Sequence, residues 1–587
     1  MKRFHSGLAL SFCIVISIFL TGCGSSGDSS SPVIAVPDDA IRNTQFGAVQ
    51  GVNDATGSGT YSWLGVPFAA PPVGDLRWKA PVDPAPWSGT LATKKFGNAC
   101  VQYGRIYGPG SNNTYDSTIG TTLNQAVGNE DCLYLNIWRP STDATNLPVI
   151  VFIHGGSDVS GYTADPWYNG ANLAKTANAV VVTVNYRVGL FGWLNLAQLK
   201  TGKSPLDDSG NFGTLDNIKA LEFIKANIAN FGGSPTNVTL TGQSAGAINV
   251  YALMVSPLTQ IAGLFQKAAA FSGGISLASE LPAGSIATLT PASTYATQGN
   301  TLLWNLLIAD GLATDTASAQ AYAATQTNVQ IATYMRSKTP SAIFTQLLTK
   351  LAPVGLSGSG PIPEGTVVPA DPVANIAAGA YTKVPFLASN TRDEAKLFAS
   401  FLALSPVLGG KPGLIVNDAT RFTMMANFNP DAAPTLTDAD LIDASYLPVT
   451  TAGTGYNAKT DLLNSIFFIP SRDNVLAALA ANQTNIWYYQ FNWAQEPAPW
   501  NDVYGAAHAF DLQFLFGNFG PGVFSNAMNS TANKPGRLAL SSAMMNSLGA
   551  FARSGDPNNA TLGVTWPVWP AKLWFDATLT DKAITVK

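Results

Sequence analysis

The residues with the clearest chemistry in this chain lie between Phe231 and Gly246, in the segment FGGSPTNVTLTGQSAG. The β-branched run before residue 242 predicts a buried strand, and a helical segment begins after the motif. A G-x-S-x-G pattern between a strand and a helix needs small flanking residues because the turn is tight and strained. Such a turn holds the serine hydroxyl clear of the sheet at a helix N-terminus. Ser244 is therefore the candidate nucleophile, provided that partners exist elsewhere in the chain.

A serine hydroxyl becomes a good nucleophile when a base removes its proton, and histidine is the side chain best suited to this near neutral pH. The chain contains three histidines, His5, His154 and His508. His5 lies in a segment that we interpret below as a leader, and another role suits His154. Elimination leaves His508 as the candidate base. The alternative is a buried histidine in a turn.

A glycine pair follows the continuous apolar run at 148–153, which is typical of a strand covered on both faces. Acyl transfer builds negative charge on the carbonyl oxygen, and the amides of glycines can approach that oxygen because no side chain blocks them. We expect Gly155 and Gly156, with the amide of Ala245, to form an oxyanion hole. An ordinary glycine turn is the alternative. His154 would then orient this loop.

The first residues have the layout of an export signal. Two basic residues precede an apolar run at 8–20 that is short for a membrane span, and the tetrapeptide LTGC follows at 20–23. LTGC resembles a bacterial lipobox, in which cleavage leaves Cys23 as a lipidated N-terminus. We therefore expect residues 1–22 to be a lipoprotein-type signal peptide. An ordinary signal peptide with an incidental cysteine is the alternative.

Residues 23–37 are rich in glycine and serine, and this composition suits a tether between an anchor and a folded body. We expect 38–587 to form a single large domain. The protein would be exported and anchored to the outer membrane through its lipid, or periplasmic or secreted if no lipid is attached. Such an anchor would change the location of the enzyme and leave its chemistry alone.

The amino-acid composition limits the classes of partner that the protein is expected to bind. Charged residues make up 12% of the chain and the formal net charge is −4. Because no excess of basic residues is present, we expect no nucleic-acid partner. Of the four cysteines, Cys13 leaves with the leader and Cys23 would carry lipid. Cys100 and Cys132 remain as the only pair, and an oxidising compartment favours a disulfide between them. Two free buried thiols are the alternative.

The remaining patterns predict an α/β fold. A helical spacing of apolar residues lies between Asp216 and Phe231, between segments that predict strands. Strand, helix and strand in succession indicate a mostly parallel sheet with helices on both faces. The expected strands are at 133–138, 148–153 and 179–184, with short antiparallel strands near 63–69 and 71–74.

These residues carry a family resemblance. Phe231 to Gly246 resembles the serine signature of the type-B carboxylesterases, a group with the α/β-hydrolase fold that includes cholinesterases and bacterial p-nitrobenzyl esterases. The segment EDCLYLN at 130–136 is similar to the second signature of that family. Further similar stretches are NYRVG at 185–189, GNFG at 210–213 and the segment 551–557. The likeness runs from about residue 47 to residue 569.

The resemblance implies further site residues. The family acid lies in an Asp-Glu-Gly turn after a strand, which implies Glu394, although Ala395 replaces the glycine here. A carboxylate between Ser244 and His508 also fits the chain order of this fold. Asp393 is the second candidate for the acid, and a solvated surface Glu394 is the alternative. The family pattern also matches His508 as the base, Ser272 as a residue behind the triad, and Cys100 with Cys132 as the first disulfide.

Two departures bear on the substrate. Many relatives have glutamate before the nucleophile, whereas this chain has Gln243, and the loss of that charge weakens a preference for cationic substrates. Cholinesterases have a tryptophan inside the first disulfide loop that stacks on quaternary ammonium, and Val101 to Asp131 contains none. We therefore expect choline esters to be poor substrates.

The sequence thus predicts a serine carboxylesterase that hydrolyses neutral carboxylic esters through an acyl-enzyme on Ser244, without a metal or an organic cofactor. The partner would be a small-molecule ester. Segments at about 277–383 and 401–468 would supply helices and loops over the site. A lipase or a polyester-degrading esterase with the same triad is the alternative, and a non-catalytic surface binding protein is a more distant one.

Overall fold

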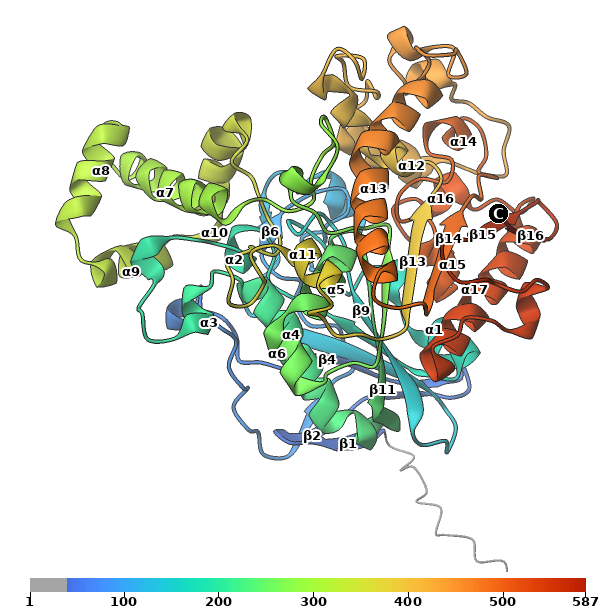
Figure 1. Cartoon of the computed structure of the whole chain (residues 1–587), viewed down its shortest axis with the longest axis horizontal. Helices are drawn as coiled ribbons and strands as arrows, with labels where there is room; N and C mark the ends of the chain where they lie inside the picture. Colours follow the sequence, from blue (N-terminus) through green and yellow to red (C-terminus); the bar gives the residue numbers. More distant parts are fainter. Residues whose placement is uncertain (1–39) are drawn as a thin grey trace, which may run out of the picture. The chain divides into compact units, whose positions relative to one another are not determined.

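The structure is a computed structural model that describes residues 40–587, and these belong to one compact unit (Figure 1). The signal peptide expected at 1–22, the lipidation expected at Cys23 and the tether expected at 23–37 lie outside the described residues. No helix within residues 40–587 is long and apolar enough to cross a membrane.

The central element is an eleven-stranded sheet. Neighbouring strands are parallel from β10 to β15, and antiparallel strands extend the sheet at both edges. The order across the sheet is β16 (Lys582–Val586), β15 (Leu573–Ala577), β14 (Ile486–Phe491), β13 (Phe386–Thr391), β12 (Lys267–Phe271), β11 (Gly233–Gln243), β9 (Leu147–Ile153), β10 (Val180–Val184), β8 (Tyr134–Pro140), β4 (Thr60–Pro67) and β3 (Val52–Asp54).

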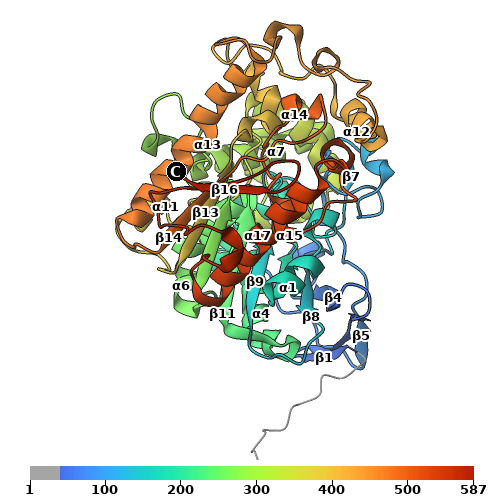
Figure 2. The same ribbon diagram turned by 90° about the vertical axis from the view of Figure 1, so that its right-hand side faces the viewer.

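Helices cover both faces of this sheet. On one side, α4 (Phe212–Asn227) and α5 (Ala245–Val255) pack against β11, and α11 (Pro372–Ala377) packs against α5. On the other side, α1 (Ala171–Ala177), α15 (Leu512–Phe516) and α17 (Lys534–Ser554) lie together, as Figure 2 shows. The strands β9, β10 and β12 are buried throughout, which explains their continuous apolar runs. The expected mostly parallel sheet between two helical layers is confirmed.

A second hydrophobic core lies beside the main one. It joins the helices that follow β12 to residues around Trp78 and Phe191. Figure 1 shows these helices projecting to one side of the sheet. They are α7 (Ala292–Ala309), α8 (Thr316–Thr325), α9 (Asn328–Arg336) and α10 (Pro340–Gln346). They occupy much of the segment expected over the site, but the residues of that segment that line the cavities described below are Ile286 to Thr288 and Ser359.

The expected elements agree with the structure apart from two local differences. No strand forms at 71–74, because the consecutive prolines Pro71 and Pro72 have no N–H to donate to a strand ladder. The helix expected from Asp216 to Phe231 begins earlier, at Phe212, and its last turn becomes the short 3₁₀ helix Ile228–Phe231. The disulfide between Cys100 and Cys132 is confirmed.

The remaining elements are short or lie towards the outside. The long helix α13 packs against α11 and against the segment after β13. The bounds of these elements are β1 (Ile41–Thr44), β2 (Gly47–Gln50), β5 (Thr90–Ala92), β6 (Gln102–Tyr103), β7 (Ala126–Val127), α2 (Gly189–Gly192), α3 (Pro205–Asp208), α6 (Pro257–Ala262), α12 (Asp418–Asn427), α13 (Tyr456–Ala480), α14 (Trp500–Val503) and α16 (Ser525–Met528).

Candidate active site

Ser244 lies in a sharp turn between β11 and α5. Its φ of 57° and ψ of −123° are strained for a residue with a side chain, and its amide donates to the Phe271 carbonyl at 2.8 Å. A Cβ on Gly242 would lie 2.2 Å from the Gly246 carbonyl oxygen, and one on Gly246 would lie 2.1 Å from that of Ile153. Both flanking positions therefore require glycine, as the motif predicts.

His508 and Glu394 are hydrogen-bonded to each other, through Nδ1 of the histidine and Oε2 of the glutamate. Both side chains are buried. The second glutamate oxygen, Oε1, accepts from the Asn390 amide at 2.9 Å and from the Thr391 backbone N–H at 2.8 Å. Burial raises the pKa of such a carboxyl, but the attraction of His508 and the surrounding hydrogen bonds outweigh it and lower the pKa of Glu394. The pair is arranged as a carboxylate that orients an imidazole.

Asp393, the second candidate for the acid, contacts other groups. Its Oδ2 accepts from the Ala506 backbone N–H at 2.9 Å and from Arg392 at 2.7 Å. Its own N–H donates to the Ala506 carbonyl at 2.9 Å. Asp393 therefore links the turn that contains Glu394 to the loop that contains His508. Of the two adjacent carboxylates, the one on Glu394 reaches the imidazole.

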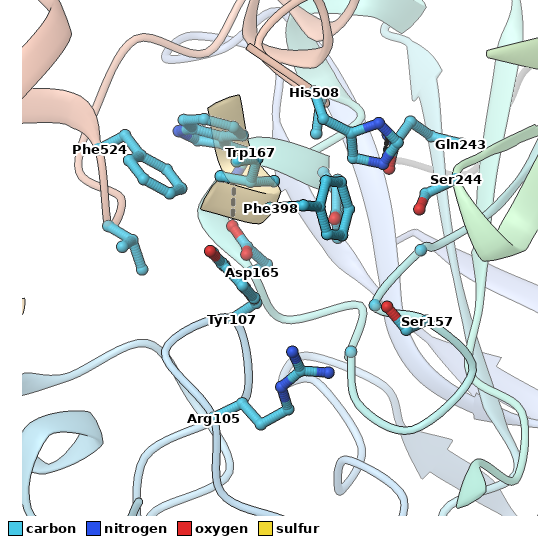
Figure 3. Close-up of a pocket in the computed structure, with 17 residues that line it drawn as sticks. Arg105, Tyr107, Ser157, Asp165, Trp167, Gln243, Ser244, Phe398, His508 and Phe524 are labelled. Carbon is cyan, nitrogen blue, oxygen red and sulfur yellow. Dashed lines mark hydrogen bonds between the residues drawn. The ribbon is translucent and has the colours of Figure 1, made fainter. Parts of the chain in front are cut away.

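Gln243 contacts the other nitrogen of the imidazole. Its side-chain Nε2 lies 3.0 Å from His508 Nε2 and donates to it, as Figure 3 shows. Ser244 forms no hydrogen bond to His508 within residues 40–587. From the sequence alone, Gln243 was expected to act through its missing charge. The structure adds a direct contact with the candidate base.

The loop after β9 provides backbone donors next to Ser244. Gly155 approaches so closely that a Cβ there would lie 2.9 Å from the Ser244 Cβ, and Gly156 has a φ of 107°, which favours glycine. Within residues 40–587 the amides of Gly155, Gly156 and Ser157 have no hydrogen-bond acceptor. The N–H of Ala245 is free as well, because the first amides of a helix have no partner within it. These groups can stabilise an oxyanion.

His154 is buried within that loop and does not face Ser244 as a base. Its ring stacks on Tyr186 with a centroid separation of 4.5 Å, and its Nδ1 lies 2.9 Å from the Gly155 carbonyl. Burial lowers the pKa of His154 to about 4, so the ring is neutral near pH 7. This placement agrees with the expected role in orienting the loop.

Two further polar side chains lie behind the Glu394 and His508 pair. The Ser272 hydroxyl is buried and forms no hydrogen bond of normal geometry within the described part of the chain, yet it lies close enough to Glu394 to help lower the pKa of that carboxyl. Asp511 is also buried and accepts from the Tyr489 hydroxyl at 2.8 Å. Burial raises the pKa of Asp511 to about 7, and the charge of Glu394 contributes to this increase. Asp511 was not among the residues predicted from the sequence.

Two cavities meet at Ser244. The first, which we name the His508 cavity, is lined by Ser244 and His508 together with Arg105, Tyr107, Asp165, Trp167, Tyr168 and Phe524 (Figure 3). The second, which we name the Ser272 cavity, is lined by Ser244, Ser272, Gly273, Gly274, Phe467 and Phe468. Ser157 and Phe398 line both cavities.

Most residues of the His508 cavity were not predicted from the sequence. Ser157 follows the glycine pair directly, so its place next to the motif was an available signal. Arg105 and Tyr107 lie inside the disulfide loop, whose only feature used for prediction was its lack of tryptophan. Asp165 and Trp167 lie in the turn around the 3₁₀ helix Pro166–Tyr168, and no local pattern indicated their approach to Ser244. These residues lie far from Ser244 along the chain and reach the site only through folding.

A mostly parallel sheet with a nucleophile turn, a histidine and an acid at the carboxyl ends of its strands defines a serine hydrolase of the α/β-hydrolase fold. A family model described as "Carboxylesterase family" matches residues 38–574. The chain therefore belongs to the carboxylesterase family and is a carboxylic ester hydrolase. The resemblance to type-B carboxylesterases is confirmed.

Individual relatives span nearly the whole chain. The chain is 31% identical to the para-nitrobenzyl esterase of Bacillus subtilis (strain 168) over 549 residues. The matched region covers 93% of this chain and 96% of that protein. The chain is 32% identical to the fumonisin B1 esterase of Sphingopyxis macrogoltabida over 92% of this chain and 87% of that protein. The solved carboxylesterase EST55 of Geobacillus stearothermophilus has a TM-score of 0.66 at 25% identity, with 93% of this chain and 98% of that chain covered.

Proposed function

We propose that Ser244, His508 and Glu394 form the catalytic triad of this carboxylesterase. The observation that carries the proposal is the hydrogen bond between buried Glu394 and His508 beside the strained turn of Ser244. A carboxylate in that position holds the imidazole tautomer and stabilises the imidazolium that forms when the serine loses its proton. Ser272 would support Glu394 from behind.

In the first half of the reaction, His508 Nε2 removes the proton from Ser244 as its oxygen attacks the ester carbonyl. Gln243 must first release that nitrogen, because one lone pair cannot accept from both side chains. The amides of Gly155, Gly156 and Ala245, joined by Ser157, would stabilise the oxyanion. Protonated His508 then donates to the departing alcohol, and water hydrolyses the acyl-enzyme in the second half.

The position of His508 indicates where each part of the ester lies. The histidine that protonates the departing oxygen must be within hydrogen-bond reach of it. His508 lines one of the two cavities and not the other. We therefore place the alcohol group of the substrate in the His508 cavity and the acyl group in the Ser272 cavity.

Hydrolysis of p-nitrophenyl butyrate by the purified protein and by Ser244→Ala tests the proposal. We expect turnover that falls by about 10,000-fold or more in the variant, because the residual rate depends on the oxyanion hole and binding alone. Ser276→Ala, a buried serine outside the triad, serves as the control. Comparable rates in Ser244→Ala and the wild type would show that another nucleophile acts. Emulsified triglyceride and several acyl lengths in the same assay separate a lipase from an esterase of small soluble esters.

Choline esters should be hydrolysed poorly. The disulfide loop contributes Arg105 to the cavity in which a choline group would lie, and residue 243 carries no negative charge. Arg105 would therefore repel a cationic alcohol group, and Asp165 in the same cavity would offset part of that repulsion. We expect kcat/KM for butyrylcholine to be about tenfold or more below that for a neutral ester with the same acyl group. Equal values would contradict this preference.

Export and lipidation rest on the LTGC tetrapeptide and the segment before it. We propose that Cys23 is acylated and anchors the enzyme to the outer membrane. Metabolic labelling with radioactive palmitate should give a labelled protein that fractionates with membranes, and Cys23→Ala should remove the label. Labelling that persists in Cys23→Ala would contradict the assignment of this cysteine.

A further inference from the structure

Arg105 is a cation in the His508 cavity that has no partner among the described residues. Its side chain is partly buried and lines the same cavity as Ser244 and His508. Figure 3 shows its guanidinium directed towards the interior of that cavity. Within residues 40–587 the guanidinium donates no hydrogen bond and forms no ion pair. Other arginines of the chain do pair with carboxylates, as Arg77 does with Glu130 and Arg187 with Asp216.

The surroundings of Arg105 strengthen its attraction for an anion. Aromatic rings form much of the cavity wall, including those of Tyr107, Trp167 and Phe524. A charge in such a weakly polar space is screened less than one in bulk water, and an arginine binds a carboxylate through two parallel hydrogen bonds. The free guanidinium is therefore well placed to bind a carboxylate that enters with the substrate.

Asp165 is the one carboxylate among the described residues that line this cavity, and it does not neutralise Arg105. It accepts from the Trp167 backbone N–H at 2.9 Å and forms no ion pair with Arg105. Burial raises the pKa of Asp165 to about 6, so the group is still charged in mildly alkaline buffer. An anionic ligand would be attracted by Arg105 and repelled by Asp165, and neither charge is neutralised by the other.

We propose that Arg105 binds a carboxylate on the alcohol portion of the ester, so that the preferred substrates are esters of hydroxy acids. This inference rests on the proposed function, because it uses His508 to place the alcohol group in the His508 cavity. The reacting ester itself is uncharged, and the carboxylate is a remote group that fixes its orientation. Hydrolysis would release a carboxylic acid and a hydroxy carboxylate, and the aromatic wall would suit a hydroxybenzoate.

Two matched esters test the proposal. 3-(Butyryloxy)benzoate carries the carboxylate, and 3-(butyryloxy)benzamide is a neutral compound of the same shape. The measured quantity is the ratio of their kcat/KM values at about pH 8, where carboxylates are ionised. We expect Arg105→Gln to lower this ratio by about 10- to 100-fold, the range for loss of a charge-assisted hydrogen bond. Arg105→Lys should recover part of it, because the charge remains but the paired donors do not.

Further variants exclude a general effect of charge. Lys203→Gln removes one positive charge from an exposed loop outside the cavity and should leave the ratio unchanged. Asp165→Asn keeps the acceptor for Trp167 but removes the opposing charge, so it should raise the ratio by about two- to fivefold. A ratio that is the same in the wild type and Arg105→Gln would overturn the proposal while the esterase activity stands.

Binding provides a readout that does not need turnover. In the Ser244→Ala protein, 3-hydroxybenzoate should bind at least about tenfold more tightly than 3-hydroxybenzamide, as measured by calorimetry. Adding Arg105→Gln should remove that difference. Equal binding of the two compounds would overturn the assignment of Arg105. Selective binding of the carboxylate by a wild-type protein that hydrolyses neither ester would instead contradict the proposed function.

Discussion

The two halves of the candidate triad differ in how completely they are bonded. Glu394 and His508 are buried, hydrogen-bonded to each other and held by Asn390 and Thr391. Ser244 makes no hydrogen bond to His508, whose Nε2 instead accepts from Gln243. Folding alone therefore organises the acid and the base. The nucleophile completes its contact only when Gln243 gives way, in keeping with the looser geometry that catalytic hydrogen bonds often have before substrate binds.

Breaking the contact between Glu394 and His508 should be more damaging than breaking the contact between Gln243 and His508. Glu394→Gln keeps the shape of the side chain but removes the charge that stabilises the imidazolium and fixes its tautomer. We expect kcat for p-nitrophenyl butyrate to fall by about 10,000-fold. Asp393→Asn is the matched comparison, because it removes a neighbouring carboxylate that does not touch His508. A larger loss in Asp393→Asn than in Glu394→Gln would make Asp393 the acid.

The buried carboxyl of Asp511, behind Glu394 and His508, should make the stability of the protein depend on pH. Its folded pKa of about 7 lies above the ordinary aspartate value, so the folded protein holds a proton there that the unfolded chain releases. Stability from this group is therefore lost as pH rises from about 4 to about 7. Asp511→Asn should become more stable relative to the wild type by about 2 to 3 kcal/mol between about pH 5 and about pH 8.

Urea unfolding at both pH values measures this difference. The exposed Asp556→Asn provides a control for removal of one negative charge. An Asp511→Asn effect of the same size at both values would show that the carboxyl does not change its protonation over this range.

Removing the contact between Gln243 and His508 should change kcat/KM less than the loss of Glu394, and in the opposite direction. Gln243→Met has a similar length but no donor, so His508 Nε2 becomes free to accept from Ser244. One hydrogen bond contributes about 0.5 to 1.5 kcal/mol, and we expect kcat/KM for neutral esters to rise by about two- to tenfold. A fall in kcat would indicate that Gln243 positions the imidazole and does not compete for it. Gln298→Met changes a buried glutamine remote from the triad and controls for packing.

Much of the site follows from local patterns because the chemistry demands them. Gly242 and Gly246 are required by contacts shorter than any side chain tolerates, so the turn around Ser244 is visible in the sequence. His508 could be predicted because the chain has only three histidines, and the family pattern favoured Glu394 over Asp393. The continuous apolar run at 148–153 predicted β9 because both faces of that strand are covered.

Side-chain contacts between distant parts of the chain could not be predicted in this way. The sequence by itself determined the fold class, the nucleophile turn, the disulfide pair and the order of the candidate triad, since each depends on residue types at short range or on the only residues of their kind. Tertiary structure alone decided that Gln243 reaches His508, 265 positions away, and that Arg105 lies in the same cavity without a partner among the described residues. The physical reason is that these contacts depend on how separate loops pack at the end of the sheet, and no local periodicity or motif encodes that distance.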